Sequence, residues 1–272
     1  MQEEEAPDAA WVRALSGRSP AACRRAIREA QSARALFDHL AREHEREGRR
    51  SYVEIDAPLE LHALVRLLRP RHVVEVGVSS GVSSAYLLHA LRMNGLGTLH
   101  SVDLPSFPGR RRPGQGPTKI SWTLPPGRGS GWAVPFPLRA RWDLRLGDKA
   151  EVLPLLASEL PRIDLFVYDV PHRDVETRGE FRLLAPRLGP GAVAIVDHGP
   201  NGELCSALRG WARSVGGAPS GRAGLGLYGF RRPRTRPTHA EGAGGRRRAV
   251  PRLSAGSSTG RSGARVRALS VA

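Results

Sequence analysis

The chain has 272 residues, enough for one sizeable domain with appendages, and its hydrophobic fraction of 40% and charged fraction of 25% are those of an ordinary globular protein. The net charge is +16, but residues 231–272 hold eleven arginines and one glutamate and so carry +10 of it. The opening MQEEEAPDAAW is acidic, and no apolar run approaches the roughly 20 residues that span a bilayer, so we expect neither a secretory signal nor a membrane helix.

The two cysteines, Cys23 and Cys205, lie far apart and lack the spacing of metal ligands. Free thiols in a reducing compartment are the expected state of such a pair. Together with the absence of membrane and export signals, this predicts a cytoplasmic protein with no membrane partner.

Helices come first along the chain, and strands and helices then alternate. Pro20 after Ser19 begins a predicted helix over residues 20–48, and leucines at near-helical spacing predict another over Pro58–Leu68. The predicted strands are 72–76, 98–103, 142–148, 163–169, 192–197 and 224–230, and the predicted helices between them are 83–93, 149–160, 174–187 and 202–215. Alternation of this kind predicts an α/β fold with a parallel sheet covered on both faces.

Residues 104–141 interrupt the alternation with a Pro- and Gly-rich segment that carries Arg110–Arg112. A loop of this length inside a compact domain is more often functional than accidental, so we expect a lid-like insertion. Its Trp122, Trp132 and Phe136 either line an apolar acceptor pocket or anchor the loop to the domain.

The chain is therefore predicted to have three parts. Residues 1–54 form an N-terminal helical extension, and residues 55–231 form the α/β domain. Residues 232–272 are so rich in Arg, Gly and Ser that they cannot bury enough apolar surface to offset the entropy of ordering, and we expect a disordered tail.

The sequence VVEVGVSSGVSSAYLL (73–88) reads as a buried strand, a glycine turn and a helix. A phosphate-binding P-loop would need a lysine after Gly81, and none is present. A dinucleotide site would need a close-approach glycine where Ser79 and Ser80 stand, which makes a nicotinamide enzyme a poor fit. Glu75, two residues before Gly77, instead suits a ligand that bears an ammonium group.

Acidic residues end four of the predicted strands: Asp103, Asp148, Asp169 and Asp197. Each can serve as a loop or helix cap, and Asp148 is equally well placed to cap the helix that follows it. The carboxyl ends of parallel strands, however, form one edge of the sheet, where ligands of doubly wound folds bind, and Asp103 lies where such folds place an acid on ribose hydroxyls. The four acids predict a ligand site at this edge.

These features resemble the class I S-adenosylmethionine-dependent methyltransferases. Glu75, Gly77, Ser79 and Gly81 stand at the positions of the acid and the three glycine-type residues of that family's first motif, with serine in place of the middle glycine. Further segments narrow the resemblance, over about residues 55–231, to the small-molecule group related to catechol-type and macrolide-sugar O-methyltransferases: GTLHSVDLP, GWAVPFPLRARWDLRLGD, LPLL, IDLFVYDVPH, EF and LGPGAVAIVDH.

The resemblance implies a doubly wound, Rossmann-like, mostly parallel seven-stranded sheet with helices on both faces. It implies S-adenosylmethionine as the cofactor, bound by the residues of the glycine turn together with Asp103 and, at the adenine edge, Asp148. It also implies a divalent cation, Mg²⁺ or another, held by Asp169 and Asp197 with His198 beside them. His198 stands where the family has Asn or Asp, so a softer metal and a site with only two protein oxygens are both open.

The same resemblance implies His172 and Asp169 as catalytic residues, with His172 as the general base and His198 as the alternative base. An imidazole is largely neutral at pH 7 and can accept a proton. Val170 and Pro171 depart from the sequence usual in the family, so catalytic competence stays open.

We therefore predict a methyltransferase that acts on a hydroxyl of a small-molecule acceptor. One alternative is an RNA methyltransferase that grips phosphates with the basic tail and Arg110–Arg112. Another is a non-catalytic protein that binds S-adenosylmethionine. The N-terminal helix is long enough to pack on a second subunit, so a homo-oligomer is an open alternative.

Overall fold

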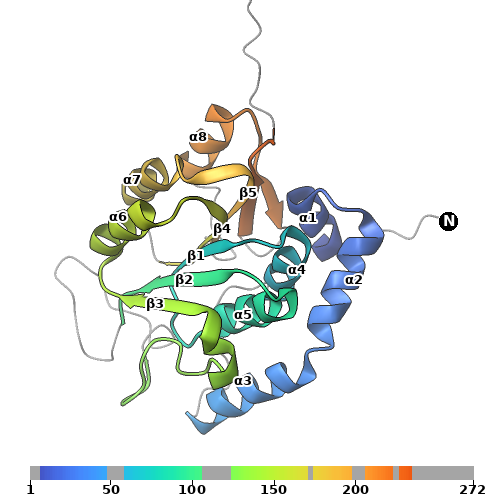
Figure 1. Ribbon diagram of the computed structural model, residues 1–272, viewed down its shortest axis with the longest axis vertical. Coiled ribbons are helices and arrows are strands. Elements are labelled where there is room, and N and C mark those ends of the chain that lie inside the picture. The colour runs from blue at the N-terminus through green and yellow to red at the C-terminus, as the bar shows by residue number, and fades with distance from the viewer. Residues whose placement is uncertain are drawn as a thin grey trace, which may run out of the picture. The chain divides into compact units, whose positions relative to one another are not determined.

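A seven-stranded sheet forms the centre of the computed structural model (Figure 1). The structure describes residues 7–47, 58–105, 124–170, 174–197, 206–222 and 227–234, all of which belong to one compact unit. The strands are β1 (His72–Val76), β2 (Thr98–Asp103), β3 (Trp142–Leu146), β4 (Ile163–Tyr168), β5 (Leu188–Asp197), β6 (Ser220–Arg222) and β7 (Leu227–Arg231).

The strands lie in the order β3-β2-β1-β4-β5-β7-β6. Strands β1 to β5 are parallel, whereas β7 runs antiparallel to both β5 and β6. The chain builds outward from β1 to β3 and then crosses back to place β4 on the other side of β1. This reversal opens the crevice at the carboxyl ends of β1 and β4 in which doubly wound folds bind their ligands. The predicted mostly parallel sheet is confirmed.

Helices cover both faces of the sheet (Figure 1). Alternating side chains explain this, because Val73 belongs to the apolar cluster on one face and Val74 to the cluster on the other. The apolar cluster on the first face includes residues of α1 (Pro7–Ser16), α2 (Pro20–Gln31), α3 (Arg34–Arg46), α4 (Pro58–Leu68) and α5 (Val82–Asn94). The second face packs against α6 (Lys149–Glu159), α7 (Asp174–Leu184) and α8 (Ser206–Ser214).

The N-terminal helices differ from the prediction in two respects. The single helix expected over residues 20–48 is two helices, because α2 ends at Gln31 and α3 begins at Arg34. At this break the Ser32 hydroxyl donates to the carbonyl of Glu29, the kind of local bond by which serine competes with helical pairing. Helix α1 was not predicted; it is held to β6 by a hydrogen bond of 3.1 Å from the indole nitrogen of Trp11 to the Ser220 carbonyl.

The predicted strands and later helices match the structure within a few residues, with two differences at the antiparallel end. Strand β5 begins at Leu188, four residues before its predicted start, and the short β6 was not predicted. Cys23 is a buried free thiol, as expected, while Cys205 lies outside the described residues.

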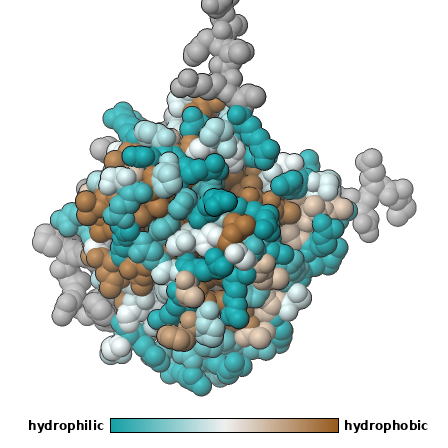
Figure 2. All heavy atoms as spheres, viewed as in Figure 1, coloured by the Kyte–Doolittle hydropathy of each residue, from teal (hydrophilic) through white to brown (hydrophobic). Residues whose placement is uncertain are grey.

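Figure 2 shows a face that is mostly hydrophilic, with apolar groups in separate small patches. Within the described ranges, no helix combines the length and the apolar character that crossing a bilayer requires.

A buried histidine on α4 predicts a pH-dependent loss of stability. His62 is fully buried, with Nε2 3.0 Å from Nδ1 of His89, and its Nδ1 has no partner among the described residues. Burial, followed by the charges of His89 and Arg66, lowers the pKa of His62 to about 3. Below about pH 6.5, His62 is therefore protonated in the unfolded chain but stays neutral in the folded chain. The free energy of unfolding thus falls as the pH drops from about 6.5 toward 3.

We expect the wild-type protein to lose roughly 2–3 kcal/mol more of its free energy of unfolding than His62→Leu does between pH 7 and pH 4.5. Urea unfolding of both proteins at the two pH values measures this difference. Parallel losses in the two proteins would show that His62 does not titrate in this way.

Candidate active site

The glycine turn between β1 and α5 lies at the crevice and is built from backbone in the left-handed region. Gly77, Ser79 and Gly81 have φ of +96°, +49° and +91°. The Gly77 amide donates to the Val102 carbonyl at 2.9 Å, and a Cβ on Gly77 would lie only 1.9 Å from the carbonyl oxygen of Asp169. The turn is therefore clamped between the ends of β2 and β4, and glycine is required at position 77.

Glu75 lies beneath this turn with no exposed surface. Its carboxylate accepts hydrogen bonds of 2.7 Å from the hydroxyls of Ser83 and Ser84 at the start of α5 and of Ser101 on β2. The indole nitrogen of Trp142 in turn donates to the Ser101 hydroxyl at 2.8 Å. Burial raises the pKa of Glu75, and the three hydroxyls oppose that rise.

In this arrangement Glu75 ties β1, β2 and α5 together under the turn. The side chain is fully buried, and contact between its carboxylate and a ligand's ammonium group stays a prediction.

Asp103, at the end of β2, reaches the turn from the side. Its Oδ1 accepts a hydrogen bond of 3.1 Å from the Val78 amide, and its Oδ2 accepts one from the hydroxyl of Ser130. Burial raises the pKa of Asp103, and these hydrogen bonds offset only part of that rise. The carboxylate predicted to meet ribose hydroxyls thus already accepts a hydroxyl, supplied by the chain itself.

The segment Arg128–Val134 lies directly over the turn. Its Gly131 amide donates to the Ser79 carbonyl at 2.8 Å, and its Ala133 amide donates to the Ser80 carbonyl at 3.0 Å. A Cβ on Gly81 would lie 2.9 Å from the Cα of Gly131, so the two backbones are in close contact. We call Arg128–Val134 the covering segment.

Helix α3 contacts both the turn and the covering segment. His44 places Nε2 3.0 Å from the Ser80 hydroxyl and its ring centroid 4.8 Å from that of Trp132. Nε2 of His39 lies 3.1 Å from the Ala133 carbonyl, and Arg128 donates to Glu47 at 2.6 Å. Trp132 therefore anchors this part of the insertion, in line with one of the two predicted roles, whereas the ring of Phe136 is 86% exposed.

The remaining predicted acids lie at the same edge of the sheet. Asp148 is exposed and caps α6, with Oδ1 accepting from the Ala150 amide at 2.9 Å. Tyr168 of β4 pairs with Val196 of β5, so the next residues, Asp169 and Asp197, occupy adjacent positions.

The described ranges contain no group of three His, Cys, Asp or Glu side chains that could hold a metal ion. Several predicted residues lie outside those ranges, namely the candidate bases His172 and His198, Arg110–Arg112, Trp122 and the tail beyond Arg234.

The strands that form this edge of the sheet match a known protein family. Residues 74–198, from β1 through the end of β5, match a family model described as a methyltransferase domain. This part of the chain is therefore similar to a methyltransferase domain.

Among solved structures, the O-methyltransferase NovP shares the fold of this chain. The O-methyltransferase NovP is 16% identical, with a TM-score of 0.51 over 68% of this chain and 83% of that one. The O-methyltransferase TomG from Streptomyces achromogenes, solved with S-adenosylmethionine, is 18% identical, with a TM-score of 0.46 over 72% and 87% of the two chains. An O-methyltransferase from Bacillus cereus is 15% identical, with a TM-score of 0.45 over 71% and 88%. No curated protein sequence matches this chain.

Sequence reasoning located the turn and expected a lid-like insertion, but it did not identify the residues that contact the turn. Ser130, His44 and the backbone of Gly131 meet the turn only through the tertiary fold, and no local pattern marks them. The contacts of Ser83 and Ser84 with Glu75 could have been predicted from the sequence, because both serines lie at the start of the helix that follows the turn.

Proposed function

We propose that this protein is a methyltransferase that transfers the methyl group of S-adenosylmethionine to a hydroxyl of a small molecule. The observation that carries the proposal is the meeting of the Gly77–Gly81 turn and the Asp103 carboxylate at the switch point of a methyltransferase fold. The sequence resembles small-molecule O-methyltransferases, and the fold is shared with the O-methyltransferase NovP. Both observations support a hydroxyl group as the methyl acceptor.

The residues present suit the donor. Asp103 accepts a hydroxyl from Ser130, and a ribose hydroxyl offers the same kind of donor to the same oxygen. The backbone of the turn would face the amino-acid part of the donor, and Asp148 would lie toward the adenine. Glu75 would act indirectly, by fixing the shape of the turn from beneath.

The covering segment sets a condition for donor binding. Ser130 has to release the Asp103 oxygen before a ribose hydroxyl can take it, so binding exchanges one hydroxyl for another at the same carboxylate. Such an exchange keeps the partly buried acceptor satisfied, which avoids the cost of an unpaired carboxylate oxygen.

S-adenosylmethionine supplies a methyl group activated by a sulfonium. The protein then has to align the acceptor oxygen with the methyl carbon, exclude water and take up the hydroxyl proton. His172, three residues after Asp169, is our candidate for that base. Asp169 and Asp197 offer two adjacent carboxylates, the oxygen ligands that hard divalent cations prefer, with His198 as the proposed third ligand.

Calorimetric titration with S-adenosylhomocysteine tests donor binding. We expect micromolar affinity for the wild-type protein and a loss of about ten-fold or more in Asp103→Ala, because a partly buried charged acceptor is removed. Asp38→Ala, at an exposed position of α3, is the matched control and should bind as the wild type does. Equal affinities in the three proteins would remove Asp103 from the site, and no binding to any of them would refute the donor assignment.

Two further measurements test the rest of the proposal. Repeating the titration with Mg²⁺ should give additional heat that Asp169→Ala abolishes if the two aspartates bind the cation. Incubation with radiolabelled S-adenosylmethionine and hydroxylated small molecules should label an acceptor. Labelling of RNA alone, lost when residues 231–272 are deleted, would favour the RNA alternative, and donor binding without any transfer would favour a non-catalytic protein.

A further inference from the structure

A second site lies at the opposite edge of the sheet, where the strands of the parallel part begin. Two adjoining cavities, of about 380 and 360 Å³, share Ser16, Arg18, Arg231 and Arg234 in their linings. The linings come from the loop between α1 and α2, the residues before β1, the starts of β4 and β5, and the end of β7. We call this place the arginine pocket.

The arginine pocket carries a large excess of positive charge. Seven arginines line it, against Asp164 as its one acidic residue. Asp164 is already committed, because it pairs with the Arg162 guanidinium and accepts the backbone amides of Arg71 and His72 at 2.8 and 3.1 Å. Little negative charge is therefore left within the pocket to balance the other guanidinium groups.

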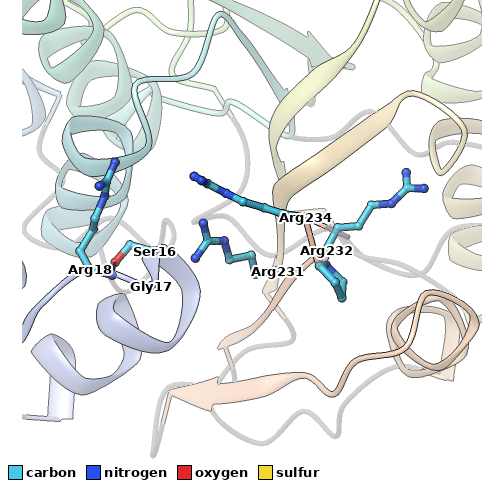
Figure 3. A pocket seen from close by; sticks show the side chains of 7 residues that line it. Ser16, Gly17, Arg18, Arg231, Arg232 and Arg234 are labelled. Atoms are coloured by element: carbon cyan, nitrogen blue, oxygen red, sulfur yellow. Dashed lines mark hydrogen bonds between the residues drawn. The ribbon is translucent and has the colours of Figure 1, made fainter. Parts of the chain in front are cut away.

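Two of these guanidinium groups point into the pocket without a hydrogen-bond acceptor. Figure 3 shows Arg231 and Arg234 directed from the end of β7 toward Arg18, while Arg232 points away. Within the described part of the chain neither Arg231 nor Arg234 makes a side-chain hydrogen bond or an ion pair. Burial, then the nearby positive charges of Arg234 and Arg18, lower the pKa of Arg231.

The backbone around the pocket makes room for these side chains. A Cβ on Gly17 would lie 2.0 Å from Nη1 of Arg231, and the stem of Arg234 passes 3.5 Å from the Cβ position of Gly191. Arg18 is steadied by a hydrogen bond of 3.3 Å from Nη2 to the Leu67 carbonyl. Three cations from two separate parts of the chain, the loop between α1 and α2 and the end of β7, thus line one cavity.

We propose that the arginine pocket binds the phosphate group of a small anionic molecule. Guanidinium groups offer paired, planar donors that match phosphate oxygens, and a phosphate among Arg18, Arg231 and Arg234 would turn mutual repulsion into charge-assisted hydrogen bonds. The pocket lies on the far edge of the sheet from the methyl-donor site, so this proposal does not depend on the proposed function.

Thermal unfolding of the full-length protein tests the proposal, with pyrophosphate as the probe and sodium chloride of equal ionic strength as the reference. At pyrophosphate about 100-fold above its Kd, we expect the Tm to rise by about 5–10 °C. The double variant Arg18→Gln/Arg234→Gln should lose most of this rise. Its Tm in chloride should equal or exceed that of the wild type, because repulsion at Arg231 is relieved.

The matched control is Arg25→Gln/Arg42→Gln, which removes two exposed arginines of α2 and α3 and should keep the full rise. Calorimetry with pyrophosphate should show a loss in affinity of about ten-fold or more for each pocket arginine removed. An equal Tm rise in both double variants would mean general screening of a basic protein and would overturn the proposal. Binding of a short single-stranded RNA without any response to pyrophosphate would overturn it in favour of a nucleic-acid surface.

Discussion

Replacing Gly77 by alanine is expected to lower the free energy of unfolding by roughly 3 kcal/mol or more, a large share of the stability of a typical domain. Two effects add at this position. The backbone has φ of +96°, which L-residues rarely adopt, and the new methyl group would lie 1.9 Å from the carbonyl oxygen of Asp169. That oxygen belongs to backbone, so relief requires the ends of β1 and β4 to separate.

Gly95→Ala is the matched control for this experiment. Gly95 ends α5 with φ of +69°, but nothing lies within 4 Å of its Cβ position, so only the backbone penalty of about 1 kcal/mol applies. Urea unfolding of the three proteins measures the difference. Equal losses in the two variants would show that the contact with Asp169 is relieved at no cost, and that the turn is not clamped as described.

The fold was predictable because its pattern is local. The runs HVVEV, TLHSVD and IDLFVY are short, apolar and separated by helical segments, which is what buried parallel strands require. The strand ends then placed Asp103, Asp169 and Asp197 at one edge without any knowledge of side-chain contacts.

The features that could not be predicted from the sequence depend on residues that are distant in the chain and meet only in the folded structure. The expectation for Glu75 rested on its distance from the glycines, whereas its enclosure depends on Ser101 and Trp142 from β2 and β3. The contact between the covering segment and the turn likewise joins residues far apart in sequence, and so does the arginine pocket. The break at Ser32 was missed for another reason, since one serine rarely ends a helix rich in Ala, Arg and Glu.

We expect the second large effect at Glu75, where two substitutions should differ sharply in their effect on the free energy of unfolding. Glu75→Leu would leave the buried hydroxyls of Ser83, Ser84 and Ser101 without their acceptor, at roughly 1–3 kcal/mol for each one that finds no other. We expect a loss of about 3 kcal/mol or more from the free energy of unfolding. Glu75→Gln keeps the shape and one acceptor oxygen, and a serine hydroxyl can rotate to accept from the amide, so little stability should be lost at neutral pH.

The pH dependence separates charge from shape in this cluster. Because burial raises the pKa of Glu75 above its unfolded value, the folded state holds the proton more tightly. The stabilisation that this gives is complete below about pH 4.5 and is lost as the pH rises through the folded pKa. The stability of Glu75→Gln relative to wild type should therefore increase from pH 5 to pH 8 in urea unfolding. A relative stability that instead decreases would mean that the three hydroxyls favour the carboxylate more than burial disfavours it, and that Glu75 holds the turn through its charge.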